Sequence, residues 1–200
     1  MKWTLPEGFQ GLIFDCDGTL VDSMPLHYQV WKTVLGRHGL DFPENLFYQY
    51  AGLPIEDIIN RLSESQGVAV NAREVGQERD DLFHSYPDSA LVPVRAVVEI
   101  ADRYRGEIPM AVATGSTRES ATASLKAIGV LDWFAGVFSS IDVGRSKPAP
   151  DVFLAAADHI GVAPQKCVAF EDGEAGMVAA RAAGMMVVDV RPWLERSDEK

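Results

Sequence analysis

The sequence predicts an α/β protein in which a doubly wound parallel sheet carries an inserted helical domain. Short continuous apolar runs alternate with helical patterns, as is typical of parallel strands that are buried on both faces and connected by helices. Polar residues with reactive side chains follow several of these runs. A helical stretch of roughly seventy residues separates the first run from the second, where a crossover needs only about thirty residues.

Five apolar runs predict the strands, so we expect a sheet of five or more strands. Each run is continuous rather than alternating, which indicates that both faces of the sheet are covered. The runs are residues 11–14, 110–113, 136–139, 167–170 and 186–190.

Helical patterns lie between these strands. Ser116 and Glu119 form a Ser-x-x-Glu capping box at the start of a helix that Gly129 should end. Two more helices are predicted, each followed by a glycine that would terminate it. They cover residues 151–160 and 175–183.

We predict that residues 22–90 form a small helical bundle, the cap domain, inserted into an α/β core made of residues 1–21 and 91–200. The predicted cap shows helical periodicity and no convincing strand. Its two connections to the core should lie close together, which would let the cap act as a lid. The predicted cap helices are residues 26–38, 54–65 and 72–84.

Composition and charge exclude several classes of protein. The chain has 200 residues and a formal net charge of −11, which gives no general attraction for nucleic acid or anionic membranes. No apolar stretch approaches the roughly 18 residues of a transmembrane helix, and no signal-peptide pattern is visible. Cys16 and Cys167 do not form a Cys-x-x-Cys motif. We therefore expect a cytoplasmic protein, monomeric or weakly dimeric, without nucleic-acid or membrane partners.

Reactive residues follow four of the predicted strands. In open α/β sheets, ligands bind beyond the carboxyl ends of the strands, so these residues should lie at one edge of the sheet. They are Asp15 and Asp17 after the first strand, Thr114, Gly115 and Ser116 after the second, Lys147 after the third, and Glu171 and Asp172 after the fourth.

Four carboxylates at one sheet edge require a cation, because crowded like charges raise pKa values and cost stability. Lys147 alone does not offset them, whereas Mg²⁺ binds a few carboxylates together with water and phosphate oxygens. Residues 114–116 lead into a helix whose free backbone amides could bind a phosphate. This combination predicts phosphoryl transfer through a covalent aspartyl-phosphate.

The motifs resemble those of the haloacid dehalogenase superfamily over nearly the whole chain. Residues 15–23, Asp-Cys-Asp-Gly-Thr-Leu-Val-Asp-Ser, match its first motif. Thr114, Lys147 and the pair Glu171-Asp172 match its second, third and fourth motifs in order. The resemblance implies a Rossmann-like core of the haloacid dehalogenase type with a small helical cap.

Three further segments resemble one branch of that superfamily. Residues 109–116 and 170–172 are most similar to the β-phosphoglucomutase-like subgroup. Within this subgroup, residues 179–191 look like those of bacterial sugar phosphatases that act on fructose 1-phosphate.

The resemblance implies a role for each matched residue. Asp15 would be the nucleophile and a Mg²⁺ ligand. Asp17 would protonate the leaving oxygen and then activate water, while its backbone carbonyl binds Mg²⁺. The remaining roles are phosphoryl binding by Thr114 and Lys147 and metal binding by Glu171 and Asp172.

Four neighbouring residues are further candidates for substrate contact. Gly115 and Ser116 belong to the predicted phosphate site, although Ser116 would equally suit a structural helix cap. Arg118, just beyond them, either steers anions or is a surface charge. His27, where the β-phosphoglucomutase-like pattern also has a histidine, either contacts substrate or packs at the hinge. Cys16 is expected to be a buried, inert thiol.

These observations predict a Mg²⁺-dependent phosphatase whose partner is a small phosphate ester, such as fructose 1-phosphate. The first alternative is a β-phosphoglucomutase-type mutase. That group has Gly-x-x-Arg-Glu-Asp in its cap, whereas residues 52–57 are Gly-Leu-Pro-Ile-Glu-Asp. Ile55 thus replaces the arginine that holds a distal phosphate, and Arg61 is the nearest substitute.

Two alternatives lie outside phosphoryl transfer. A metal-independent dehalogenase would share the fold, but the metal-site pattern that includes Asp17 and Asp172 argues against it. A non-enzymatic sensor of phosphorylated ligands would not need to keep both Asp15 and Asp17.

Overall fold

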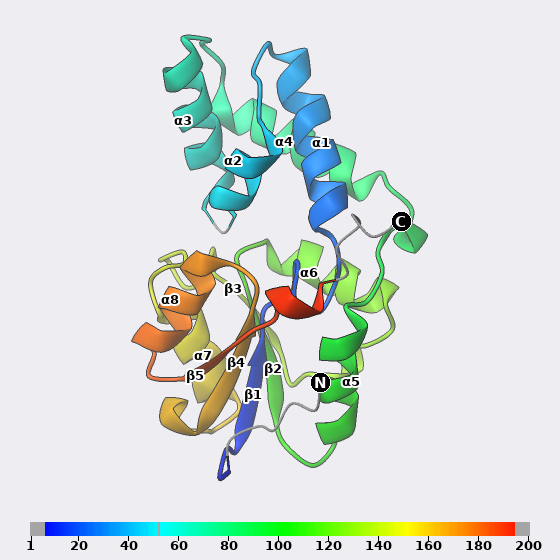
Figure 1. The fold of residues 1–200 in the computed structure, drawn as a ribbon, viewed down its shortest axis with the longest axis vertical. Helices are drawn as coiled ribbons and strands as arrows, with labels where there is room; N and C mark the ends of the chain where they lie inside the picture. The colour runs from blue at the N-terminus through cyan, green and yellow to red at the C-terminus, as the bar shows by residue number, and fades with distance from the viewer. Residues whose placement is uncertain (1–6, 52, 195–200) are drawn as a thin grey trace.

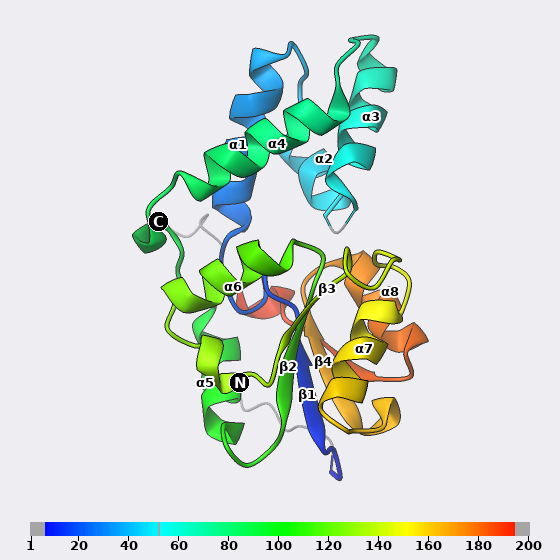
Figure 2. The same cartoon turned by 180° about the vertical axis from the view of Figure 1, so that it is seen from behind.

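The computed structural model describes residues 7–51 and 53–194. The ends of the predicted core, residues 1–6 and 195–200, and Gly52 of the cap segment lie outside the described residues. Figure 1 and Figure 2 show an α/β layer structure with a group of helices at one end of its sheet.

The sheet has five parallel strands in the order β3-β2-β1-β4-β5, which confirms the predicted fold class. The chain winds outward from the central strand β1 in both directions, so the carboxyl ends beside β1 form the edge where ligands bind in such sheets. The strands are β1 (Gly11–Phe14), β2 (Met110–Thr114), β3 (Val137–Ser139), β4 (Cys167–Glu171) and β5 (Met186–Asp189).

Helices cover both faces of the sheet, as the continuous apolar strands predict. Leu12 and Phe14 of β1 belong to one hydrophobic cluster, which includes residues of α5 and α6. Ile13, between them, belongs to a second cluster that includes residues of α7 and α8. The helices are α5 (Arg95–Tyr104), α6 (Arg118–Ala127), α7 (Asp151–His159) and α8 (Glu174–Ala182).

Four more helices stand beyond the carboxyl ends of the strands and have a hydrophobic cluster of their own (Figure 1). They include α2, a six-residue helix that the sequence pattern did not predict. We call these helices the cap. They are α1 (Met24–Arg37), α2 (Glu44–Gln49), α3 (Ile55–Gln66) and α4 (Ala72–His84).

The two connections between the cap and the sheet run side by side. The Asp22 amide donates to the Val92 carbonyl at 2.8 Å, and the Val94 amide donates to the Leu20 carbonyl at 3.0 Å. An isolated bridge pairs Val21 with Pro93. The cap is therefore joined to the core through one narrow, hydrogen-bonded pair of segments. Its independent movement stays a prediction.

The helix after β2 begins one residue later than the sequence predicts. Its N-cap is Thr117, whose hydroxyl accepts a hydrogen bond from the Ser120 amide at 3.2 Å. The predicted Ser116 capping box is wrong, because the Ser116 side chain is used elsewhere, on Asp17. The short 3₁₀ segments are η1 (Asp88–Ala90), η2 (Leu131–Trp133), η3 (Pro164–Lys166) and η4 (Arg191–Trp193).

Within the described part of the chain, no helix has both the length and the apolar character required to cross a membrane.

Candidate active site

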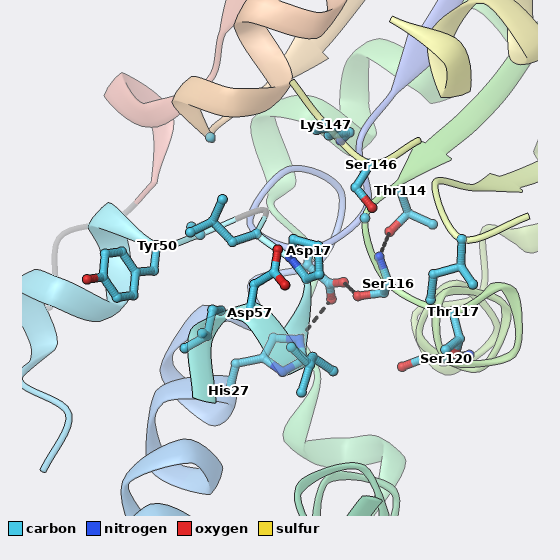
Figure 3. A pocket seen from close by; sticks show the side chains of 18 of the residues that line it. Asp17, His27, Tyr50, Asp57, Thr114, Ser116, Thr117, Ser120, Ser146 and Lys147 are labelled. Atoms are coloured by element: carbon cyan, nitrogen blue, oxygen red, sulfur yellow. Dashed lines mark hydrogen bonds and ion pairs between the residues drawn. The ribbon is translucent and has the colours of Figure 1, made fainter. Parts of the chain in front are cut away.

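A cavity of about 530 Å³ lies between the cap and the carboxyl ends of the strands. Both parts of the molecule line it, and its size is in the range that holds a small metabolite. Figure 3 shows Asp17 between Ser116 and His27, with Lys147 on the core side and Asp57 on the cap side.

Lys147 lies between two carboxylates at the floor of the cavity. Its Nζ is 2.6 Å from Asp15 Oδ1 and 2.5 Å from Glu171 Oε1. All three residues are buried. Burial alone would lower the pKa of Lys147, but the Asp15 and Glu171 carboxylates raise it more, so the ammonium stays charged.

Backbone and hydroxyl donors fix the carboxylate of Glu171, the last residue of β4, and that of Asp172, which follows it. The Gly173 amide donates to Glu171 Oε2 at 2.8 Å, and the Thr19 hydroxyl donates to Asp172 Oδ1 at 2.9 Å. Gly18 has φ +81°, and a Cβ there would overlap the Asp172 carboxylate. Glycine at position 18, in the first motif, therefore leaves space for the Asp172 carboxylate of the fourth motif.

Asp15, Glu171 and Asp172 form a candidate metal site. Each contributes a carboxylate oxygen, and these oxygens all lie within 4.8 Å of one another. Burial and then the neighbouring Glu171 charge raise the pKa of Asp172 to about 7. The same two causes raise the pKa of Asp15 well above its usual range. Crowded, desolvated oxygen donors with one lysine among them fit a hard divalent cation.

Asp17 points to a different set of partners. Ser23 Oγ and Ser116 Oγ each donate to its carboxylate at 2.7 Å, and His27 Nε2 lies 3.1 Å from Oδ1. Burial would raise the pKa of Asp17, but the interaction with His27 and the hydrogen bonds from Ser116 and Ser23 hold it well below its usual range. These partners occupy the Asp17 carboxylate. Binding of a metal by the Asp17 backbone carbonyl stays a prediction.

His27 is held in turn by Arg79 of α4. Arg79 Nη2 contacts His27 Nδ1, and the guanidinium forms an ion pair with Asp80 at 2.7 Å. Arginine only donates hydrogen bonds, so Nδ1 is the acceptor and Nε2 carries the proton that points at Asp17. The histidine therefore links the cap to the core.

The predicted phosphate site also lines the cavity. Thr114 is 1% exposed, and its Oγ1 accepts from the Ser116 amide at 3.0 Å. Gly115 follows directly. The structure does not bring Arg118 to this group. It pairs with Asp142 at 2.9 Å on the surface, because it lies on an outward side of α6.

Cys16 is fully buried in the hydrophobic cluster beneath the site, as expected. Thr19 and Ser23 belong to the first motif, although their contacts could not be assigned from it. Arg79 was missed altogether, since nothing in its local sequence distinguishes it from other charged positions of a surface helix.

The chain is similar to known hydrolases over most of its length. Residues 9–184 match the family model described as "Hydrolase: haloacid dehalogenase-like hydrolase". The chain is 37% identical over 185 residues to fructose-1-phosphate phosphatase YqaB of Escherichia coli, covering 92% of this chain and 98% of that protein. It is 25% identical over 190 residues to β-phosphoglucomutase of Bacillus subtilis, covering 90% and 83% of the two chains.

A solved structure shows the same architecture. A conserved haloacid dehalogenase-like protein from Agrobacterium tumefaciens superposes with a TM-score of 0.76 at 30% identity, covering 91% of this chain and 82% of that one. The resemblance predicted from the four motifs is confirmed. The chain belongs to the haloacid dehalogenase-like hydrolase family.

Proposed function

We propose that this protein is a Mg²⁺-dependent phosphatase of sugar monophosphates, such as fructose 1-phosphate, and that Asp15 is its nucleophile. The observation that carries the proposal is the buried group at the cavity floor. There the Asp15 carboxylate touches the Lys147 ammonium and lies beside Glu171 and Asp172. The similarity to a fructose-1-phosphate phosphatase supports the choice of substrate.

The proposed reaction assigns one role to each of these side chains. An Asp15 oxygen attacks phosphorus, and the bond from phosphorus to the sugar oxygen breaks. That oxygen takes a proton from Asp17, which must therefore be protonated when the substrate is bound, unlike the carboxylate held by His27 and the two serines. Asp17 then takes a proton from water, which attacks the phospho-aspartate and releases phosphate. Lys147 and the hydroxyl of Thr114 hold the transferring group, whose negative charge must be stabilised.

Bound Mg²⁺ would be held by the Asp15, Glu171 and Asp172 carboxylates and the Asp17 carbonyl, and would neutralise charge on the phosphoryl oxygens. Gly115 and Ser116 line the cavity just before α6, a position that suits a bound phosphate. The Ser116 amide, which donates to Thr114 Oγ1, would have to change partner to bind it.

The cap wall favours a phosphatase over a mutase. Ile55 lines the cavity and offers no cation where the mutases have arginine. Arg61 is not a cavity residue in the described structure, and its guanidinium lies 5.8 Å from the centre of the Tyr50 ring. Arg79 is engaged with His27 and Asp80. Arg73 is then the cap cation best placed for a second phosphate.

An assay of the purified protein with Mg²⁺ and a panel of hexose phosphates tests the proposal. We expect inorganic phosphate from fructose 1-phosphate and little glucose 6-phosphate from β-glucose 1-phosphate. Faster formation of glucose 6-phosphate, dependent on added bisphosphate and abolished by Arg73→Met, would establish the mutase instead. Halide release without metal would establish a dehalogenase, and phosphate-ester binding without turnover would establish a sensor.

We also propose that the enzyme works in the cytoplasm. Cys16 and Cys167 are both free and buried, which suits a reducing compartment.

A further inference from the structure

Gly176 lies in the first turn of α8, directly against the carboxylate of Glu171. It is a buried helical residue whose φ is not positive, so its backbone conformation does not require glycine. Glycine is among the least favourable residues in a helix, whereas alanine is the most favourable. Some other constraint must account for glycine at this position.

The constraint is the space that Glu171 occupies. A Cβ at Gly176 would overlap Oε1 and Cδ of Glu171 and would lie 2.7 Å from Oε2. The same Oε1 accepts from Lys147 at 2.5 Å, and Oε2 accepts from the Gly173 amide at 2.8 Å. Both oxygens that the missing Cβ would displace are therefore in use.

We propose that Gly176 is a positioning residue, which acts through Glu171 to keep the Lys147 ammonium against the nucleophile Asp15. Its effect on catalysis rests on the function proposed above, whereas its effect on the carboxylate does not. The effect passes through three contacts. The missing side chain at Gly176 leaves space for Glu171, Glu171 forms an ion pair with Lys147, and Lys147 forms a second ion pair with Asp15.

The expected consequence of Gly176→Ala is local. The atoms that would be struck are the far end of a flexible side chain, so Glu171 can swing away while α8 stays folded. Lys147 then keeps one of its two carboxylate partners, and the candidate metal site loses one of its three carboxylates. Alanine should favour the helix, whereas loss of the Glu171 contacts should weaken Mg²⁺ binding.

The test is a double-mutant cycle between Gly176→Ala and Glu171→Ala, read by Mg²⁺ titration calorimetry, thermal unfolding and phosphate release. In the wild-type background, we expect Gly176→Ala to weaken Mg²⁺ binding about tenfold, the effect of losing one charged contact. In the Glu171→Ala background, the same change should alter Mg²⁺ affinity by less than about twofold. There it should also raise the unfolding midpoint by about 2 °C, because alanine favours the helix.

Gly36 of α1 provides a matched control. It is also a helical glycine near a helix end, but nothing lies within 4 Å of a Cβ built there. Gly36→Ala should leave Mg²⁺ affinity and phosphate release unchanged in both backgrounds.

Equal loss of Mg²⁺ affinity in both backgrounds, or no loss in either, would overturn the role of Gly176. If Gly176→Ala fails to fold, folding of the double variant would support the role, whereas failure of both would contradict it. The wild-type protein could lack phosphatase activity while Gly176→Ala still weakens Mg²⁺ binding only when Glu171 is present. That result would refute the proposed function and support this inference.

Discussion

His27 Nε2 lies 3.1 Å from Asp17 Oδ1, so a side chain of the first cap helix contacts a residue that follows the first strand of the core. Arg79 of α4 completes the contact from the other side of the imidazole ring. The surroundings of Asp17 therefore depend on where the cap stands relative to the sheet. We therefore expect closure of the cap to be coupled, through these residues, to the protonation of Asp17.

Arg79→Met should lower kcat by about tenfold, because the histidine loses the donor that fixes its tautomer and orientation. Mg²⁺ affinity should stay within about twofold, since Arg79 does not contact the three clustered carboxylates. Steady-state kinetics with Mg²⁺ titration checks both. Arg61→Met, on the neighbouring helix α3 and outside the cavity lining, is the control and should behave as wild type. A tenfold loss from both variants would point to general destabilisation of the cap.

Asp172→Ala should weaken Mg²⁺ binding and phosphate release together, because few protein oxygens would hold the cation. High Mg²⁺ concentration should restore part of the activity. Asp102→Ala removes an exposed carboxylate from α5 and should change neither quantity. If the wild-type protein kept its full activity in excess EDTA, catalysis would not depend on a metal.

Ile55→Arg should convert an apolar part of the cavity wall into a phosphate-binding one. We expect inhibition by fructose 1,6-bisphosphate to strengthen about tenfold, the effect of one charge-assisted contact to the second phosphate. Ile55→Met, which adds length without charge, is the control. Unchanged inhibition by the bisphosphate in the arginine variant would mean that position 55 does not face the distal end of the substrate.

The cap should move about the paired connections at Asp22 and Val92. Structures with and without a phosphate analogue should show α1 to α4 displaced as a unit, with the backbone changes confined to residues 20–23 and 91–94. A cap that stays in place when the analogue binds would contradict its assignment as a lid.

The sheet was predictable because its strands are buried on both faces and therefore read as uninterrupted apolar runs. Strand β1 agrees with the prediction at both ends, and β2 and β4 each extend by one polar residue, Thr114 and Glu171. These are the residues that reach the cavity. The strands could be predicted because their burial on both faces is visible in the sequence pattern.

Only one of the two missed helices has a physical explanation. Helix α2 has six residues, too few to show a period of 3.6, and it begins after Pro43. Helix α5 does carry a readable signal, because Val97, Ala101 and Tyr104 recur at helical spacing and pack on the core. It could have been predicted from the sequence.

The site was predictable to the extent that it follows the ends of strands. Asp15, Lys147 and Glu171 meet because parallel strands bring their carboxyl ends together. Arg79 reaches the site only because α4 packs across α1, and the pairing of these helices leaves no local signal. Arg118 lies elsewhere, paired with Asp142, because a position near the predicted phosphate-binding turn does not fix the direction of a side chain.

The most direct test of this account is the rate of phosphate release from fructose 1-phosphate by Asp15→Asn, measured with saturating Mg²⁺ beside the wild type. Asparagine preserves size and hydrogen bonding but has no carboxylate to attack phosphorus. The account predicts a loss of several orders of magnitude, on the order of 10³-fold or more, with an unchanged unfolding transition. Substantial turnover by a folded variant, shown by mass spectrometry to retain asparagine, would contradict the phospho-aspartate mechanism.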